Sequence, residues 1–363
     1  MKKLYFLITF LFLTTGYLSA QVDVVTGLSN PARILLDGTD LYIAESGSGT
    51  VSKIDITAAL PATATPVVTG ITSPYGLYIN GTDLYIADIE DGIIYKKDLS
   101  DTDPAGPLTT VVSGLSQPGD LAINGDDLYI AEYGIGIPAA VGTSIISRID
   151  LLNVDPGTTL ETVITGVEGI GGIVFDGNNL YISSYDNDEL VKIDISGFIA
   201  TPIVAAPGDQ VIAGVDQPDG LYLDGTTLYM GLSTNVSTID INSPGVPDVL
   251  IGAGTTISDL ELNGTDLYYA DINNNKIMLY DLTTASVSKY NTLGITMYPN
   301  PSNDFIKISG LTNTASYEIS NMLGAKVQTG KVSQNENINV RSLNKGMYFV
   351  KLENGASLKF IKK

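Results

Sequence analysis

The chain of 363 residues contains no cysteine, no histidine and no tryptophan. Without cysteine and histidine, the protein can form no disulfide, no thiol nucleophile, no histidine-dependent catalytic triad and no zinc or copper site with sulfur or imidazole ligands. Carboxylates, tyrosines, hydroxyls, amides and a few basic side chains remain. A metal site in this chain would therefore need oxygen ligands, which hard cations prefer.

Positive charge is scarce over most of the chain. Residues 21–293 hold 36 acidic and 8 basic side chains, a net charge of −28, whereas residues 294–363 hold 4 acidic and 9 basic side chains, a net charge of +5. This change in charge predicts a domain boundary. The acidic part repels nucleic-acid phosphates and anionic lipid, so we expect no nucleic-acid partner. Divalent cations or cationic ligands fit such a surface better.

Only one apolar run is long enough to suggest targeting or a membrane. It covers residues 4–18, follows two lysines and precedes Ser19-Ala20. This charged, apolar and small-residue order is typical of a signal peptide. The run of about 15 residues is shorter than the roughly 20 needed to span a bilayer as a helix. We therefore predict a signal peptide over residues 1–20, a mature start at Gln21 and no transmembrane span after its removal.

One short phrase recurs six times, with an Asp-Gly or Asn-Gly pair followed two residues later by Leu-Tyr. The copies begin at Asp37, Asn80, Asn124, Asp176, Asp224 and Asn263. These pairs tolerate positive φ, so each copy predicts a tight turn between two strands. Further short apolar runs flank each copy, and no helical periodicity is present. Four strands in about 45 residues are typical of a propeller blade. The sequence thus predicts an all-β, six-bladed β-propeller over residues 21–290.

Two segments could close the ring. Residues 22–27 match the fourth-strand segment of later units, for example residues 66–70, and we predict that they complete the last blade. Pairing the two ends of the propeller in one sheet would remove an exposed edge. The alternative closing strand is residues 286–290.

The repeats resemble the NHL and gluconolactonase-like propeller superfamily, whose blades contain Pro-x-Gly, an apolar strand, an Asp-Gly turn and a closing Ala-Asp. This fold hosts both enzymes and binding modules. For the hydrolases, the resemblance implies a divalent metal held by Glu, Asn and Asp from separate blades. Pro218-Asp219-Gly220 reproduces the Asp phrase, but Arg33 and Gly171-Gly172 stand where Glu and Asn are expected. A metal-dependent lactonase-like or esterase-like hydrolase is therefore the alternative and not the leading hypothesis.

The hairpin geometry places the start of each first strand and the end of each second strand on one face of the propeller. Side chains there that depart from the repeat are the predicted ligand-binding residues: Arg33, Tyr75, Asp120, Tyr133, Tyr185, Asp219 and Asp259. Three of them, Asp120, Asp219 and Asp259, could bind a hard cation such as Ca²⁺. At least one of the three could instead pair with Arg33. No other cofactor is expected.

Two further sets of repeated residues are given structural roles. The acids that end the second strands, Glu45, Asp88, Glu132 and Asp271, are expected to accept hydrogen bonds from neighbouring turns. The tyrosines of the repeated phrase are expected to pack between blades, because one occurs in every copy. They are Tyr42, Tyr85, Tyr129, Tyr181, Tyr229 and Tyr268.

The pattern changes at residue 295, after a linker over residues 291–294. Short alternating strands without a helix predict a small β-sandwich. Residues 295–363 resemble the type A C-terminal sorting domain of the type IX secretion system, through Tyr298, Pro299, Asn300 and Pro301, through Gly346 and Tyr348, and through the basic C-terminus. The resemblance implies the type IX secretion machinery as a partner. It also implies a protein that is secreted, extracellular or on the outer-membrane surface.

The leading functional hypothesis is an exported, non-enzymatic propeller that binds an extracellular ligand at its acidic face. The ligand class stays open between a glycan, a protein and a cation-bridged ligand. The first alternative is the divalent-metal-dependent hydrolase, with Asp219 as a metal ligand. The second is a passive extracellular structural protein.

Overall fold

The computed structural model describes residues 21–136, 138–153, 160–197, 201–252, 254–283, 296–309, 311, 314–321, 325–352 and 357–363. The chain divides into two compact units, residues 1–282 and residues 283–363. The predicted signal peptide and the predicted linker lie outside the described residues. Within the described ranges, no helix has the length and hydrophobicity that crossing a bilayer would need.

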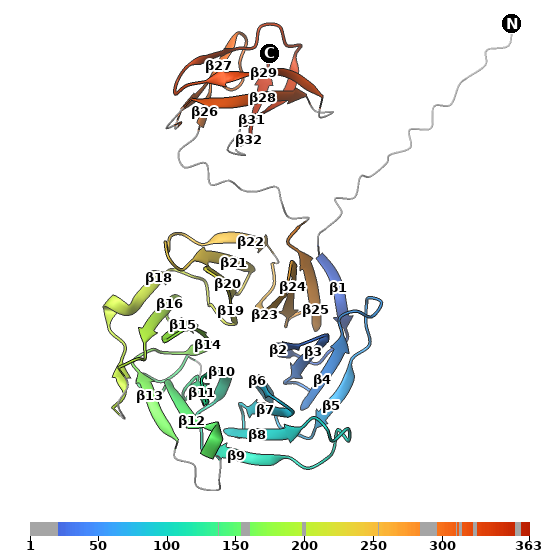
Figure 1. Ribbon diagram of the computed structural model, residues 1–363, viewed down its shortest axis with the longest axis vertical. Coiled ribbons are helices and arrows are strands. Elements are labelled where there is room, and N and C mark those ends of the chain that lie inside the picture. Colours follow the sequence, from blue (N-terminus) through green and yellow to red (C-terminus); the bar gives the residue numbers. More distant parts are fainter. Residues whose placement is uncertain are drawn as a thin grey trace, which may run out of the picture. The chain divides into compact units, whose positions relative to one another are not determined.

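The first unit consists of six sheets around a common axis (Figure 1), each with four antiparallel strands, which confirms the predicted six-bladed propeller. Blade 1 contains β2 (Pro31–Asp37), β3 (Asp40–Glu45), β4 (Thr50–Asp55) and β5 (Thr65–Thr69); blade 2 contains β6 (Pro74–Asn80), β7 (Asp83–Asp88), β8 (Ile93–Asp98) and β9 (Thr109–Ser113). Blade 3 contains β10 (Pro118–Asn124), β11 (Asp127–Glu132), β12 (Ile145–Asp150) and β13 (Glu161–Thr165), with β17 (Ile203–Val204) added in parallel to β13.

Blade 4 contains β14 (Ile170–Asp176), β15 (Asn179–Ser184), β16 (Glu189–Asp194) and β18 (Gln210–Ala213). Blade 5 contains β19 (Leu221–Asp224), β20 (Thr227–Gly231), β21 (Asn235–Asp240) and β22 (Asp248–Gly252). Blade 6 contains β23 (Ile257–Asn263), β24 (Asp266–Asp271), β25 (Lys276–Asp281) and, from the N-terminus, β1 (Gln21–Thr26). Two short 3-10 helices, η1 (Leu151–Asn153) and η2 (Pro207–Asp209), lie in connections.

The repeated glycines form the predicted turns between the first two strands of each blade. In blade 1, Gly38 has a φ of +62°, and the flanking residues Asp37 and Asp40 pair with each other. This left-handed backbone is what glycine adopts without steric cost. The inner strand of each blade is therefore followed at once by a partner that runs back toward the opposite face.

The N-terminal strand closes the ring. β1 pairs antiparallel with β25, from Gln21 opposite Tyr280 to Thr26 opposite Lys276. Val24 and Val25 of β1 are buried. The prediction that this strand completes the last blade is confirmed, while the alternative strand over residues 286–290 lies outside the described residues.

The propeller core consists of apolar layers between neighbouring blades. In β3, Leu41 and Ile43 face the cluster shared with blade 6, whereas Tyr42 and Ala44 face the cluster shared with blade 2. Alternate side chains of a strand point to opposite faces of its sheet, and here both faces are covered. All six tyrosines of the repeated phrase are buried, which confirms their predicted packing role.

The second unit is built from two sheets. One contains β26 (Thr296–Tyr298), β27 (Phe305–Ser309) and β30 (Asn337–Asn339), and the other contains β29 (Lys326–Val332), β28 (Ala315–Asn321), β31 (Gly346–Leu352) and β32 (Ser357–Lys362). Ile306 and Ile338 of the first sheet share one apolar core with Ile319, Val350 and Phe360 of the second. This arrangement is the small β-sandwich that the sequence predicts.

The closure of the ring can be tested with two valines of the same strand. Val24→Ala removes a fully buried side chain and should lower the free energy of unfolding by about 2 kcal/mol. Val22→Ala is the matched control, because Val22 is 44% exposed. Urea unfolding followed by circular dichroism measures both effects. Equal, small losses for the two variants would show that β1 does not carry the closure.

Candidate functional site in the central channel

Bulges at the starts of three inner strands aim Arg33, Asp120 and Asp259 into the central channel. The pairing of β2 with β3 shifts register between Pro31 and Arg33, and equivalent shifts precede Asp120 and Asp259. Such bulges re-aim a side chain. The six equivalent positions are Arg33, Gly76, Asp120, Gly172, Gly220 and Asp259. The glycines leave the space that the long side chains need: a Cβ on Gly220 would meet the Asp259 carboxylate 2.3 Å away.

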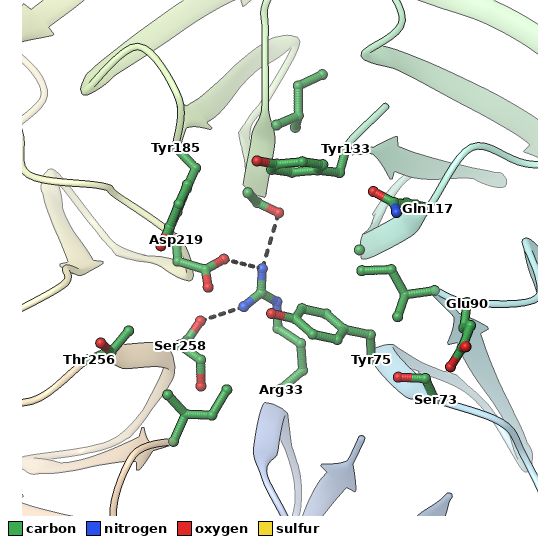
Figure 2. Close-up of a pocket in the computed structure, with 15 residues that line it drawn as sticks. Arg33, Ser73, Tyr75, Glu90, Gln117, Tyr133, Tyr185, Asp219, Thr256 and Ser258 are labelled. Atoms are coloured by element: carbon green, nitrogen blue, oxygen red, sulfur yellow. Dashed lines mark hydrogen bonds and ion pairs between the residues drawn. The ribbon is translucent and has the colours of Figure 1, made fainter. Parts of the chain in front are cut away.

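Arg33 lies at the centre of this ring of residues and is 2% exposed. Its guanidinium donates hydrogen bonds to the carbonyl oxygen of Ser258, to the carbonyl oxygen of Gly171 at 3.0 Å and to Asp219 Oδ1 at 2.6 Å (Figure 2). Its Nε lies 3.6 Å from Asp120 Oδ1. One side chain of blade 1 thus connects blades 3, 4, 5 and 6 across the channel.

The carboxylates of Asp120 and Asp259 also bond to the exposed edges of inner strands. Asp259 Oδ2 accepts the N–H of Ile34, and Asp120 Oδ2 accepts the N–H of Ile173. Each bond crosses to the next blade, from blade 6 to blade 1 and from blade 3 to blade 4. Unpaired N–H groups of an inner strand are costly when they are buried, so these carboxylates complete its hydrogen bonding.

Burial and the excess of acidic side chains shift the pKa values of the residues in this cluster. Burial opposes the charge of Arg33, but Asp219, Asp120 and Asp259 outweigh it and hold the pKa of Arg33 well above its usual value. Burial raises the pKa of Asp259 to about 7; Arg33 opposes this shift and Asp120 adds to it. Burial also raises the pKa of Asp120, with Arg33 opposing. These shifts are expected where three carboxylates share one guanidinium.

A pocket of about 550 Å³ opens above Arg33 and Asp219. Tyr75, Tyr133 and Tyr185 contribute rings from blades 2, 3 and 4, as Figure 2 shows. The rest of the lining comes from Ser73, Ile89, Glu90, Gln117, Gly119, Ile170, Gly171, Thr256, Ser258 and Ile272. A pocket of this size with mostly apolar walls and a few polar groups suits one small ligand.

Tyr133 is held in place from outside the pocket. Its hydroxyl donates to Asp186, 2.9 Å from Oδ1, and the same carboxylate accepts the N–H of Ala139 at 2.8 Å. Asp186 thereby connects the end of blade 4's second strand to the loop that follows β11. Burial raises the pKa of Tyr133, and the hydrogen bond to Asp186 adds to the shift, so the phenol stays neutral.

The structure brings together five of the seven predicted ligand-binding residues in the pocket lining: Arg33, Tyr75, Tyr133, Tyr185 and Asp219. The other two, Asp120 and Asp259, do not line the pocket and lie with Arg33 beneath it. The predicted pairing of an acid with Arg33 is confirmed. Sequence reasoning missed Asp186, whose carboxylate holds Tyr133 and the loop after β11.

The three acids that the sequence offered as ligands of a metal cation have other partners in the structure. The three acids considered for Ca²⁺, namely Asp120, Asp219 and Asp259, surround the guanidinium of Arg33 and strand N–H groups. Among the residues that the structure describes, no group of three or more acidic side chains is placed to hold a metal ion. The cation that these carboxylates face in the structure is therefore an arginine of the chain itself.

The acids that end the second strands have the structural role predicted for them. Asp88 accepts backbone N–H groups of Thr72 and Ser73 and of the following turn. Glu45 and Glu132 each accept one backbone N–H and one serine hydroxyl, and Asp271 accepts the hydroxyl of Thr255 and the N–H of Asn274. They tie loops within each blade and do not enter the pocket.

The motif residues of the second unit lie at two places in its sandwich. Asn300, between Pro299 and Pro301, donates to the carbonyl oxygen of Lys359 at 2.9 Å and accepts the N–H of Ile361 at 3.0 Å. Tyr298 is 44% exposed. In β31, which begins at Gly346, Tyr348 stacks on Phe360, with ring centroids 5.5 Å apart. The motif thus fixes the last strand to the start of the unit.

Comparison with known families identifies the second unit. Residues 296–363 match the family of secretion system C-terminal sorting domains. The predicted resemblance to the type IX sorting domain is confirmed, and with it the prediction that the protein is exported and is secreted or located at the cell surface. No curated protein sequence matches the chain.

Solved structures similar to the propeller have diverse functions. The aldose sugar dehydrogenase of Streptomyces coelicolor, solved with PQQ bound, is 19% identical, with a TM-score of 0.56 over 71% of this chain and 96% of that chain. A gluconolactonase from Xanthomonas campestris is 16% identical, with a TM-score of 0.52 over 71% and 87%. A chain of the nidogen/laminin complex is 18% identical, with a TM-score of 0.54 over 68% and 90%. These similarities establish the fold alone.

The central ion cluster makes a strong prediction for stability. Arg33→Ala would leave three carboxylates without their guanidinium and should lower the free energy of unfolding by about 3–5 kcal/mol. The control is Lys53→Ala, which removes a half-exposed pair with Asp40 at 2.7 Å and should cost about 0–1 kcal/mol. Denaturant titration compares the two. A loss for Arg33→Ala no greater than for Lys53→Ala would show that the cluster is not structurally important.

The raised pKa of Asp259 predicts a pH dependence of stability. The folded carboxyl holds its proton up to about pH 7, whereas an unfolded aspartate releases its proton near pH 4. The stabilisation that results from this difference in pKa is therefore complete below about pH 4. It is lost from the free energy of unfolding as the pH rises through 7. Asp259→Asn keeps an oxygen for the N–H of Ile34 and removes the titration. Between pH 6 and 8 the wild type should lose about 1.4 kcal/mol relative to this variant.

Thermal or urea unfolding at several pH values measures this difference. Exposed Asp248→Asn is the control and should follow the wild type at every pH. A stability difference between wild type and Asp259→Asn that stays constant from pH 6 to 8 would contradict the assignment.

Proposed function

We propose that the exported propeller is a non-enzymatic binding module that takes one small ligand into the channel pocket. The observation that supports this most directly is the pocket itself, with tyrosines from three blades above a floor of Arg33 and Asp219. Cross-channel contacts fix this floor, so little ordering is needed on binding. Such preorganisation favours affinity.

The arrangement of the acids favours binding over hydrolysis. Asp219 Oδ1 is hydrogen-bonded to Arg33, while Asp120 and Asp259 bond to strand N–H groups. A general base needs a basic carboxylate directed at the proton that it removes, and the contacts with Arg33 and with strand N–H groups lower the basicity of these acids. The chain has no histidine or cysteine to replace them. The hydrolase alternative is therefore not favoured.

The sorting domain gives this binding module its location. Because the protein is secreted or at the cell surface, the pocket would meet solutes outside the cell. The strong negative charge of the propeller would repel anionic solutes and attract cationic ones before contact. A purely structural role would not account for a preformed pocket of about 550 Å³.

A pocket-filling variant tests the proposal. Gly119 lines the pocket, and a Cβ added there would meet no atom closer than 4.0 Å, so Gly119→Leu can occupy the space without a backbone clash. Gly245→Leu is the control, at an exposed glycine with no neighbour within 4 Å. A panel of neutral sugars, organic cations and organic anions at millimolar concentration is screened by calorimetry.

The wild type and Gly245→Leu should bind at least one compound, and Gly119→Leu should bind it at least tenfold more weakly. No binding by the wild type, or equal binding by all three proteins, would reject the channel pocket as a ligand site.

A further inference from the structure

The floor of the pocket has more acidic than basic side chains, and above about pH 7, where Asp259 has lost its proton, it carries an excess of negative charge. One guanidinium, that of Arg33, faces the three carboxylates of Asp120, Asp219 and Asp259. Arg33 is 2% exposed, and Asp219 and Asp259 are each 8% exposed. Charges in such a poorly solvated region interact over longer distances than in water. An additional cation near this floor would reduce the repulsion among the acids, whereas an anion would increase it.

Arg33 has little capacity left to bind an anion. Its two terminal nitrogens already donate to the carbonyl oxygens of Ser258 and Gly171 and to Asp219. Carboxylate and phosphate ligands are usually held by a guanidinium that offers two parallel N–H groups. In this pocket those groups point into the scaffold, so the basic residue does not make the site an anion site.

The walls of the pocket suit a positive charge. Tyr75, Tyr133 and Tyr185 line it, and the faces of aromatic rings attract cations within about 6 Å of the ring centroid. Tyr75 already has such a contact, because the guanidinium carbon of Arg33 lies 5.0 Å from its centroid. The rings of Tyr133 and Tyr185 are the walls that remain for a ligand.

Asp219 is the acidic residue of the floor that lines the pocket. Its Oδ1 is bonded to Arg33, and among the described residues its Oδ2 accepts no hydrogen bond. After burial, the charge of Asp219 is the next largest cause that raises the pKa of Tyr75 and of Tyr185, whereas at Tyr133 Asp186 acts more strongly than Asp219. Asp219 and the three tyrosines line the same pocket.

We propose that the ligand of this pocket is a small organic cation, with its ammonium group between the tyrosine rings and facing Asp219 Oδ2. This inference rests on the proposed binding function and names the class of its ligand. Neutral sugars of similar size would also contact the rings, but they would leave the excess negative charge uncompensated.

Choline and its uncharged isostere, in which carbon replaces the nitrogen, are the probes that isolate the charge. They have nearly the same shape, so any difference in affinity reports the cation. Calorimetry on the exported protein should show choline binding at least tenfold more tightly than the isostere. Equal affinities, or no binding of choline in the millimolar range, would overturn the inference.

Two variants test which residues bind the positive charge of choline. Asp219→Asn keeps an oxygen for Arg33 but removes the charge, and it should weaken choline binding about tenfold while leaving binding of the isostere unchanged. Tyr185→Leu should weaken choline binding by a similar factor, with Tyr95→Leu on β8, outside the pocket, as the control. If Asp219→Asn does not fold, Tyr185→Leu against its control decides the question. Unchanged choline affinity in the folded variants would contradict the proposal.

Sugar binding separates this inference from the proposed function. If a neutral sugar binds, choline does not, and Gly119→Leu blocks the sugar, the channel pocket is a ligand site and the cation inference is wrong. If no compound of the whole panel, sugar, cation or anion, binds the wild type, both are wrong.

Discussion

The buried guanidinium of Arg33 is the interaction on which the centre of this propeller depends. Inner strands of a propeller converge on the axis with one edge unpaired, and polar groups on that edge need partners. Here carboxylates from blades 3 and 6 accept strand N–H groups, and Arg33 compensates part of the charge that those carboxylates bring. Well-packed apolar groups in place of such a network often give a protein of equal stability, whereas removal of one charged partner alone is strongly destabilising.

The same network shapes the pocket above it. Because Arg33 is bonded to Gly171, Ser258 and Asp219, it fixes the positions of three blades on the channel face at once. Asp219 bonds to Arg33 through Oδ1 and also lines the pocket. The same residue therefore belongs to the ion network and to the pocket lining, so the floor contains charges where a purely structural channel could be filled with apolar side chains.

The repeated phrase predicts the architecture well because each copy forms the same turn between the same two strands. Asp37-Gly38 and its equivalents specify a turn, and the buried tyrosines specify a layer between blades, so periodicity alone predicts six sheets. The closing strand was predictable because residues 22–27 share the pattern of a fourth strand. Departures from the repeat also identified Arg33, Asp120 and Asp259 correctly as neighbours across the channel.

Contacts between loops were harder to predict. Asp186 holds Tyr133 through a loop of another blade, and nothing in the repeat indicates which loop an acid will reach. Asp219 lines the pocket, whereas Asp120 does not and bonds instead to the N–H of Ile173 in the next blade. The sequence pattern places both residues on one face but does not give their depth.

The pairing of β1 with β25 has a consequence for how the chain becomes a folded protein. Lys276 Nζ and Asp23 Oδ1 lie 2.8 Å apart although they are separated by 253 residues. Contacts this distant in sequence form late, because a very long loop must close first. A growing or partly translocated chain therefore has an incomplete sixth blade, and it reaches full cooperativity only when its two distant ends are in the same compartment.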